Sequence, residues 1–85
     1  MRHPIIGLTL HYRHAALTDR CVRSLLADGA DAVLVWDNTS DGGESAKGIT
    51  VCQEQPERIA LEISPANIGF AAGVNRGIAA ILARW

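Results

Sequence analysis

The sequence predicts an α/β fold, a Rossmann-like three-layer α/β/α arrangement with a short parallel sheet. Three short apolar runs alternate along the chain with segments of helical periodicity. Two of these runs are nearly continuous in apolar residues, as in strands that are buried on both faces. Short buried strands alternating with helices indicate a layered fold with a parallel sheet. Right-handed crossovers then place successive strands side by side, in the order 3-2-1.

The first strand is expected at 4–10, where the sequence reads PIIGLTL. A helix should follow and end near Gly29, because glycine is the usual residue after a helix C-terminus. The helical face that we expect to be buried consists of Leu17, Cys21, Val22, Leu25 and Leu26. Cys21 is therefore expected in the core.

The second strand is expected at 32–36, followed by a loop at 37–43 that is rich in turn residues. Residues 44–57 fit neither a helix nor a loop well, because a glycine and a β-branched run interrupt any helical pattern. The third strand is expected at 58–64, where apolar and polar residues alternate. Helical spacing then extends from Phe70 to the end of the chain.

Composition limits the class of protein. The 85 residues suffice for one domain, 48% of them are apolar and the net charge is −1, which argues against disorder and against a nucleic-acid partner. Cys21 and Cys52 match no zinc spacing and indicate a reducing compartment. No run is long enough for a transmembrane helix. We therefore expect a cytoplasmic protein, or one peripheral at the inner face of the membrane.

Ligands of parallel sheets bind beyond the carboxyl ends of the strands. Three segments with polar or glycine residues lie there in this sequence: 11–14, 37–43 and 65–69. Asp37 can accept a hydrogen bond from a ribose hydroxyl or a base N–H, or it can make the turn together with Asn38. The loop resembles a calcium-binding loop only in part, because Thr39 stands at a ligand position.

The first of these segments carries two histidines and an arginine. His11 and His14 have H-x-x-H spacing, a weak metal signal without a third ligand, and we expect solvated side chains. Arg13 can pair with a phosphate or remain a surface arginine.

Glycines are unusually frequent in residues 65–78, PANIGFAAGVNRGI. Each glycine inside a helix costs up to about 1 kcal/mol relative to alanine. Small residues let a helix approach either the sheet or a flat ligand. Packing alone explains Asn67 and Asn75 poorly, because buried amides need partners. The segment also lacks the G-x-G-x-x-G fingerprint of dinucleotide-binding domains.

Together, the segments GLTLHYR, CVRSLL, VLVWDNTSDGG and SPANIGFAAGVNRGI resemble the opening of a family 2 glycosyltransferase with the GT-A fold, in its rhamnosyltransferase-like branch. The order of the motifs and the spacing within each are intact. His11 and Trp36 depart from the residues usual in the family.

The resemblance implies a site for a UDP- or dTDP-sugar donor in an enzyme of polysaccharide biosynthesis whose acceptor is a glycan or is lipid-linked. It places the Tyr12–Arg13 loop beside the nucleotide and Asp37 on the base or ribose. The segment from Asn67 to Asn75 would line the base and ribose pocket. The nucleotide-binding residues implied are Tyr12, Arg13, Asp37, Asn38, Asn67, Gly69, Gly73 and Asn75.

Family members bind a divalent metal through a D-x-D motif and use a later carboxylate as catalytic base. Neither occurs in these 85 residues. We therefore expect residues 1–85 to be a single, incomplete nucleotide-sugar-binding domain without activity of its own, with Mg²⁺ or Mn²⁺ needed only by a full-length member. The alternatives are a non-catalytic nucleotide-binding or interaction module and a small flavodoxin-like or dinucleotide-binding domain.

Self-association is also expected. In the 3-2-1 order the strand at 4–10 lies at an edge of the sheet and carries no charge. Uncharged apolar edges are templates for pairing with another chain.

Overall fold

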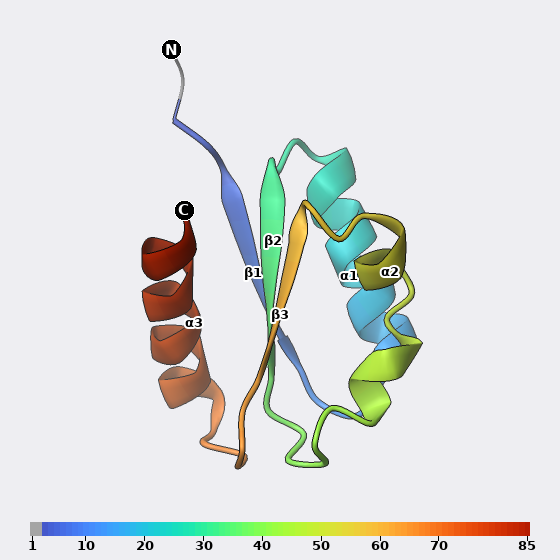
Figure 1. The fold of residues 1–85 in the computed structure, drawn as a ribbon, viewed down its shortest axis with the longest axis vertical. Helices are drawn as coiled ribbons and strands as arrows, with labels where there is room; N and C mark the ends of the chain where they lie inside the picture. Colours follow the sequence, from blue (N-terminus) through green and yellow to red (C-terminus); the bar gives the residue numbers. More distant parts are fainter. Residues whose placement is uncertain (1–2) are drawn as a thin grey trace.

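The computed structural model describes residues 3–85 as a three-stranded parallel sheet with helices (Figure 1). Its elements, in chain order, are β1 (Ile6–His11), α1 (Ala15–Ala27), β2 (Ala32–Asp37), the 3₁₀ turn η1 (Ser45–Gly48), α2 (Val51–Glu54), β3 (Ile59–Ile63) and α3 (Phe70–Arg84). The strands lie in the order β1-β2-β3, which confirms the predicted neighbours and the edge position of β1. In the register, Leu8 is paired with Leu34, and Leu34 in turn with Ala60.

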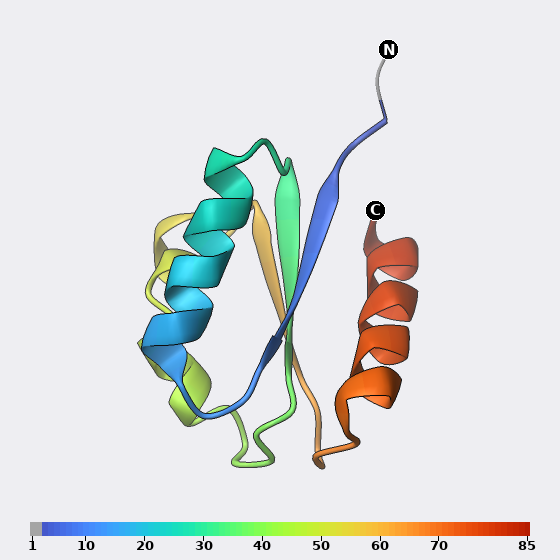
Figure 2. The same ribbon diagram turned by 180° about the vertical axis from the view of Figure 1, so that it is seen from behind.

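Helices lie on both sides of the sheet. The first two, α1 and α2, lie on one side and α3 lies on the other (Figures 1 and 2). A cluster of buried hydrophobic residues fills the α1 side: Val22, Ala30, Val33, Val35, Ala46, Ile49, Val51 and Ile59. The ambiguous segment 44–57 forms η1 and the single-turn α2, and both contribute to this cluster.

The prediction of which α1 residues are buried is partly wrong. Val22 is fully buried, but Leu17 is 56% exposed and Cys21 is an exposed free thiol. Cys21 lies at the outer flank of α1, where its Sγ is 3.4 Å from the Thr9 hydroxyl of the edge strand. Among the described residues no strand continues the sheet beyond β1, so this flank has nothing to pack on.

Two glycines of α3 face the sheet. A Cβ built on Gly77 would lie 2.6 Å from Leu8 Cδ1, and one on Gly73 would lie 2.8 Å from both Leu10 Cδ2 and Asn38 Nδ2. Both distances are shorter than real Cβ contacts, so these positions admit only glycine without a shift of their neighbours. Of the two explanations that the sequence left open, approach of the helix to the sheet accounts for Gly73 and Gly77.

Candidate functional site

The three polar segments meet at the carboxyl ends of the strands, as expected (Figure 1, lower end). Two backbone hydrogen bonds continue the sheet into these loops: the Asn38 N–H donates to His11 O and the Ser64 N–H donates to Asp37 O, each at 2.9 Å. Because the strands hold the starts of all three loops in register, the loops are fixed relative to one another.

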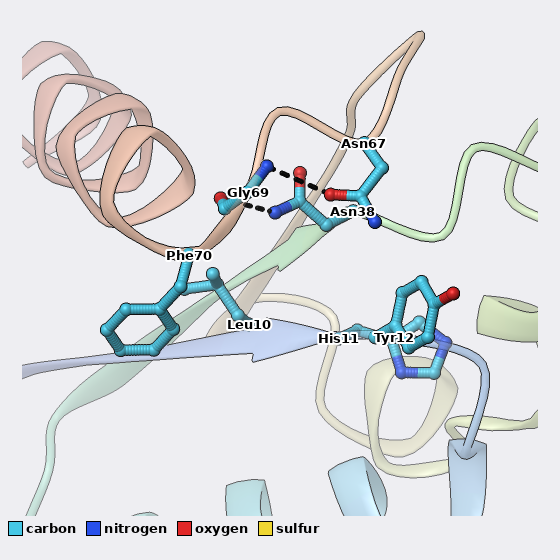
Figure 3. A pocket seen from close by; sticks show the side chains of 7 residues that line it. All are labelled: Leu10, His11, Tyr12, Asn38, Asn67, Gly69 and Phe70. Atoms are coloured by element: carbon cyan, nitrogen blue, oxygen red, sulfur yellow. Dashed lines mark hydrogen bonds between the residues drawn. The ribbon is translucent and has the colours of Figure 1, made fainter.

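A hollow of about 400 Å³ lies between the ends of β1 and β2 and the N-terminus of α3 (Figure 3). It is lined by Leu10, His11, Tyr12, Asn38, Asn67, Gly69 and Phe70. Each of the three loops contributes at least one of these residues. The lining combines an apolar floor, two exposed aromatic rings and two amide side chains, a composition that suits a flat, partly polar ligand.

Asn38 is the central polar residue of the hollow. Its side chain is almost fully buried. Its Nδ2 donates to Gly69 O at 2.9 Å, and its Oδ1 accepts from Trp36 Nε1 at 3.0 Å. Asn38 therefore ties the end of β2 to the turn that starts α3.

Asn67 and Gly69 form that turn. Asn67 Oδ1 accepts the Gly69 N–H at 2.9 Å, and Gly69 has a φ of +83°, a backbone conformation that favours glycine. The bond uses the oxygen of the Asn67 amide, and its nitrogen faces the hollow (Figure 3). Asn67 thus has a structural role and still presents a donor to a ligand.

Tyr12 forms the opposite wall, and Arg13 packs against its ring. The Tyr12 ring is 46% exposed, and the Arg13 guanidinium lies 4.8 Å from its centroid. Arg13 has a φ of +64°, uncommon for a residue with a side chain, and its N–H donates to Thr39 Oγ1 at 2.9 Å. The Arg13 side chain stacks behind Tyr12 and does not line the hollow.

Asp37 is fully buried and does not line the hollow either. Its Oδ1 accepts the Thr39 N–H at 2.9 Å, so the turn-making interpretation is confirmed for this oxygen. Its Oδ2 is buried and has no hydrogen-bond partner among residues 3–85. A buried carboxylate oxygen without a partner is costly, which makes it the acceptor in this region most in need of a donor.

The expectation of a solvated His11 is wrong. The ring is fully buried on the α1 side of the sheet, with Nδ1 2.6 Å from Thr18 Oγ1 and Nε2 2.9 Å from Ser45 Oγ. The first strand predicted from the sequence ends at residue 10, whereas β1 includes His11, which continues the strand's alternation, so burial of this ring was not expected. Burial lowers the pKa of His11 below 6.5, although the Asp37 and Asp41 carboxylates oppose the shift.

This buried histidine makes stability depend on pH. Because the folded pKa lies below the unfolded one, the unfolded chain binds more protons in the window between the two values. The free energy of unfolding should therefore be full above about pH 6.5 and fall as the pH drops through the folded pKa. Urea titrations from pH 7.5 to 5 measure this slope. His11→Gln should flatten it, whereas His3→Gln, at an exposed position, should keep it. An unchanged slope in His11→Gln would assign the effect to other groups.

The structure brings together some of the expected site residues and separates others. Four line the hollow: Tyr12, Asn38, Asn67 and Gly69. Gly73 lies beneath the Asn38 side chain, and Asn75 is exposed on α3, so its amide needs no buried partner. Leu10, His11 and Phe70 line the hollow and were not anticipated. Phe70 is 76% exposed. Its position directly after Gly69, a predicted site residue, was the sequence signal that could have identified Phe70 as part of the lining.

No group of three or more histidine, cysteine, aspartate or glutamate side chains in residues 3–85 is placed to hold a metal ion. Within the same residues, none of the helices has both the length and the apolar character needed to cross a membrane. Comparison of the chain with models of protein families, with curated proteins and with solved structures found no match.

Proposed function

We propose that this chain is the nucleotide-sugar-binding part of a glycosyltransferase, with the hollow as the site for the nucleoside of a UDP- or dTDP-sugar. One observation carries the proposal. The three motifs that resemble family 2 glycosyltransferases converge on a single hollow, to which they contribute Tyr12, Asn38 and the Asn67–Gly69 turn.

The lining supports a nucleoside over a purely apolar or a highly charged ligand. Tyr12 and Phe70 offer exposed ring faces for stacking, and the Leu10 side chain adds an apolar floor. The Asn67 amide nitrogen is a donor suited to a base carbonyl or a ribose oxygen. Arg13 stacks on Tyr12 and would place its positive charge beside a phosphate.

Asp37 is buried outside the lining of the hollow, and we assign it a contact with the ligand that forms only on binding. The proposal assigns its unpartnered Oδ2 to a base N–H or a ribose hydroxyl, which requires a small displacement of the loop at 38–43. Binding would then satisfy a buried acceptor that the free protein leaves without a donor.

The chemical step lies outside the proposal for this chain. A leaving nucleoside diphosphate develops negative charge that a metal ion normally neutralises. Residues 3–85 contain no group of three or more histidine, cysteine, aspartate or glutamate side chains that could hold such an ion. Transfer to a glycan or lipid-linked acceptor is therefore proposed only for a protein that supplies the metal ligands and the base.

Calorimetric titration with UDP, dTDP and ATP, each with and without Mn²⁺, tests the site. We expect weak binding of the two pyrimidine nucleotides, weaker binding of ATP, and little effect of Mn²⁺. Tyr12→Ala should weaken UDP binding by about 5- to 150-fold, since loss of a stacked ring costs about 1–3 kcal/mol. His14→Ala, an exposed neighbour outside the hollow, is the control. Equal affinities for ATP and UDP would contradict the assignment.

Asp37→Ala tests the second contact and should remove most of the binding. Asp41→Ala is the matched control, because Asp41 also accepts backbone N–H groups of this loop but has both oxygens occupied. If the two variants bind UDP alike, Asp37 only shapes the turn. Circular dichroism of both variants verifies that they remain folded.

A further inference from the structure

One side of the molecule presents the open edge of β1 between α1 and α3 (Figure 2). We call this surface the β1 face. Its exposed apolar residues are Ile5, Leu17, Cys21, Phe70, Ile78 and Leu82. Leu82 is 77% exposed.

The contacts of α1 and α3 show that both flanks point past β1. On α1, Asp19 and Arg23 bond to α2 or to Thr50 just before it, so the opposite flank with Cys21 lies toward the edge strand. On α3, Arg76 lines a second hollow with Ser64 and Pro65, which follow β3. Helical periodicity places Ile78 and Leu82 on the other flank, toward β1.

The free edge of β1 carries backbone N–H and C=O groups that a further strand could pair with. The Ile5 carbonyl accepts from Asp31 N–H and the His11 carbonyl accepts from Asn38 N–H, so the odd-numbered residues of this stretch face β2. By alternation, Ile6, Leu8 and Leu10 direct their backbone N–H and C=O groups outward. None of the described strands pairs with these groups, since β1 is terminal in the sheet.

We propose that the β1 face binds a second copy of this chain, with the two β1 strands antiparallel about a two-fold axis at Leu8. Leu8 would pair with Leu8 of the partner subunit, and Ile6 with the partner subunit's Leu10. Each of these would be a hydrogen-bonded pair of an antiparallel ladder, in which the two residues exchange both N–H···O bonds. The axis also sets α1 beside α1 and α3 beside α3, so both apolar flanks are covered.

Charge favours self-pairing. Residues 4–12, PIIGLTLHY, contain no aspartate, glutamate, lysine or arginine, and burial of His11 lowers its pKa and favours the neutral ring, so no like charges meet between the two strands. An isologous contact requires a surface complementary to itself, and an uncharged strand with apolar flanks meets that requirement. The pairing would also bring Ile6 of the partner subunit beside Leu10, at the open side of the hollow.

Sedimentation velocity over a range of concentrations tests the proposal, with a dimer of twice the 9.1 kDa chain mass expected. Ile6→Pro removes an outward N–H at the first strand residue, where proline is tolerated, and should yield monomers. Ile78→Lys and Ile78→Glu should each raise the dissociation constant by about tenfold or more. Ile78 follows Gly77, which packs on Leu8, so it lies near the axis.

Mixing the lysine and glutamate variants should restore the dimer, because opposite charges then meet across the axis. Ala79→Lys, on the exposed outer side of α3, is the matched control and should remain dimeric. A monomeric wild type at high concentration would overturn the proposal. So would a dimer that survives in Ile6→Pro and in both Ile78 variants, since the interface would then lie elsewhere. Circular dichroism confirms that each variant is folded.

Discussion

Asn38→Ala is expected to lower the free energy of unfolding by about 2 kcal/mol and to open the hollow. The substitution removes the acceptor of Trp36 Nε1 and the donor to Gly69 O. Each lost partner of a buried polar group costs about 1–3 kcal/mol, and re-exposure of the Gly69 carbonyl to water keeps the sum at the lower end. Urea unfolding followed by tryptophan fluorescence measures the change, because Trp36 itself reports on the site.

Asn75→Ala is the matched control, since it removes the same amide from an exposed position on α3. It should leave stability unchanged or raise it slightly, because alanine is the better helix former. Asn38→Asp separates the two bonds of Asn38: it keeps the acceptor for Trp36 and loses the donor to Gly69. If Asn38→Ala and Asn75→Ala have the same free energy of unfolding, the two hydrogen bonds of Asn38 make no net contribution to stability.

Gly73→Val is expected to destabilise the protein by about 1–3 kcal/mol, the usual cost of overpacking. The new Cβ would meet two atoms at 2.8 Å, the Leu10 Cδ2 and the Asn38 Nδ2. Leu10 can move its side chain, but the Asn38 amide is held by two hydrogen bonds. The helix must therefore move away from the sheet. A domain of this size buries a smaller share of its surface than a larger domain does, so such a loss is a large part of its stability.

Ala72→Val is the control for Gly73→Val, because it places the same side chain at the neighbouring, exposed helix position. It should cost only the modest helix propensity of valine, below about 1 kcal/mol. Chemical denaturation of both variants, monitored by circular dichroism, compares them directly. Equal stabilities would mean that α3 can withdraw from the sheet without loss.

The sequence was sufficient for features that depend on local pattern. Apolar runs located all three strands to within two residues, and helical spacing located α3 from Phe70 onward. The strand order followed from the handedness of crossovers. The three loops of the site were predicted because the carboxyl ends of parallel strands share one edge.

Features that depend on contacts between distant residues could not be predicted. The N-terminus of α2 is held by the Asp19 carboxylate, whose Oδ1 accepts the Val51 N–H at 2.8 Å across 32 residues of sequence. His11 is buried because two hydroxyls, on α1 and η1, reach its ring. The free oxygen of Asp37 depends on how the loop folds over it. The direction of the His11 ring follows the alternation of β1, but the partners of these three groups leave no periodic signal in the sequence.

The helices on the two sides of the sheet are packed to different extents, so ligand binding should affect the docking of α3 more than that of α1. The large buried cluster lies wholly on the α1 side, whereas α3 rests on the sheet through two glycines with most of its apolar flank outside. Sub-global opening should therefore begin with α3 swinging away from an otherwise intact core. The hollow has one wall on that movable element and one on the stable edge strand. A molecule that contacts both walls would bind only the form in which α3 is docked on the sheet. Its binding would therefore shift the equilibrium toward that form.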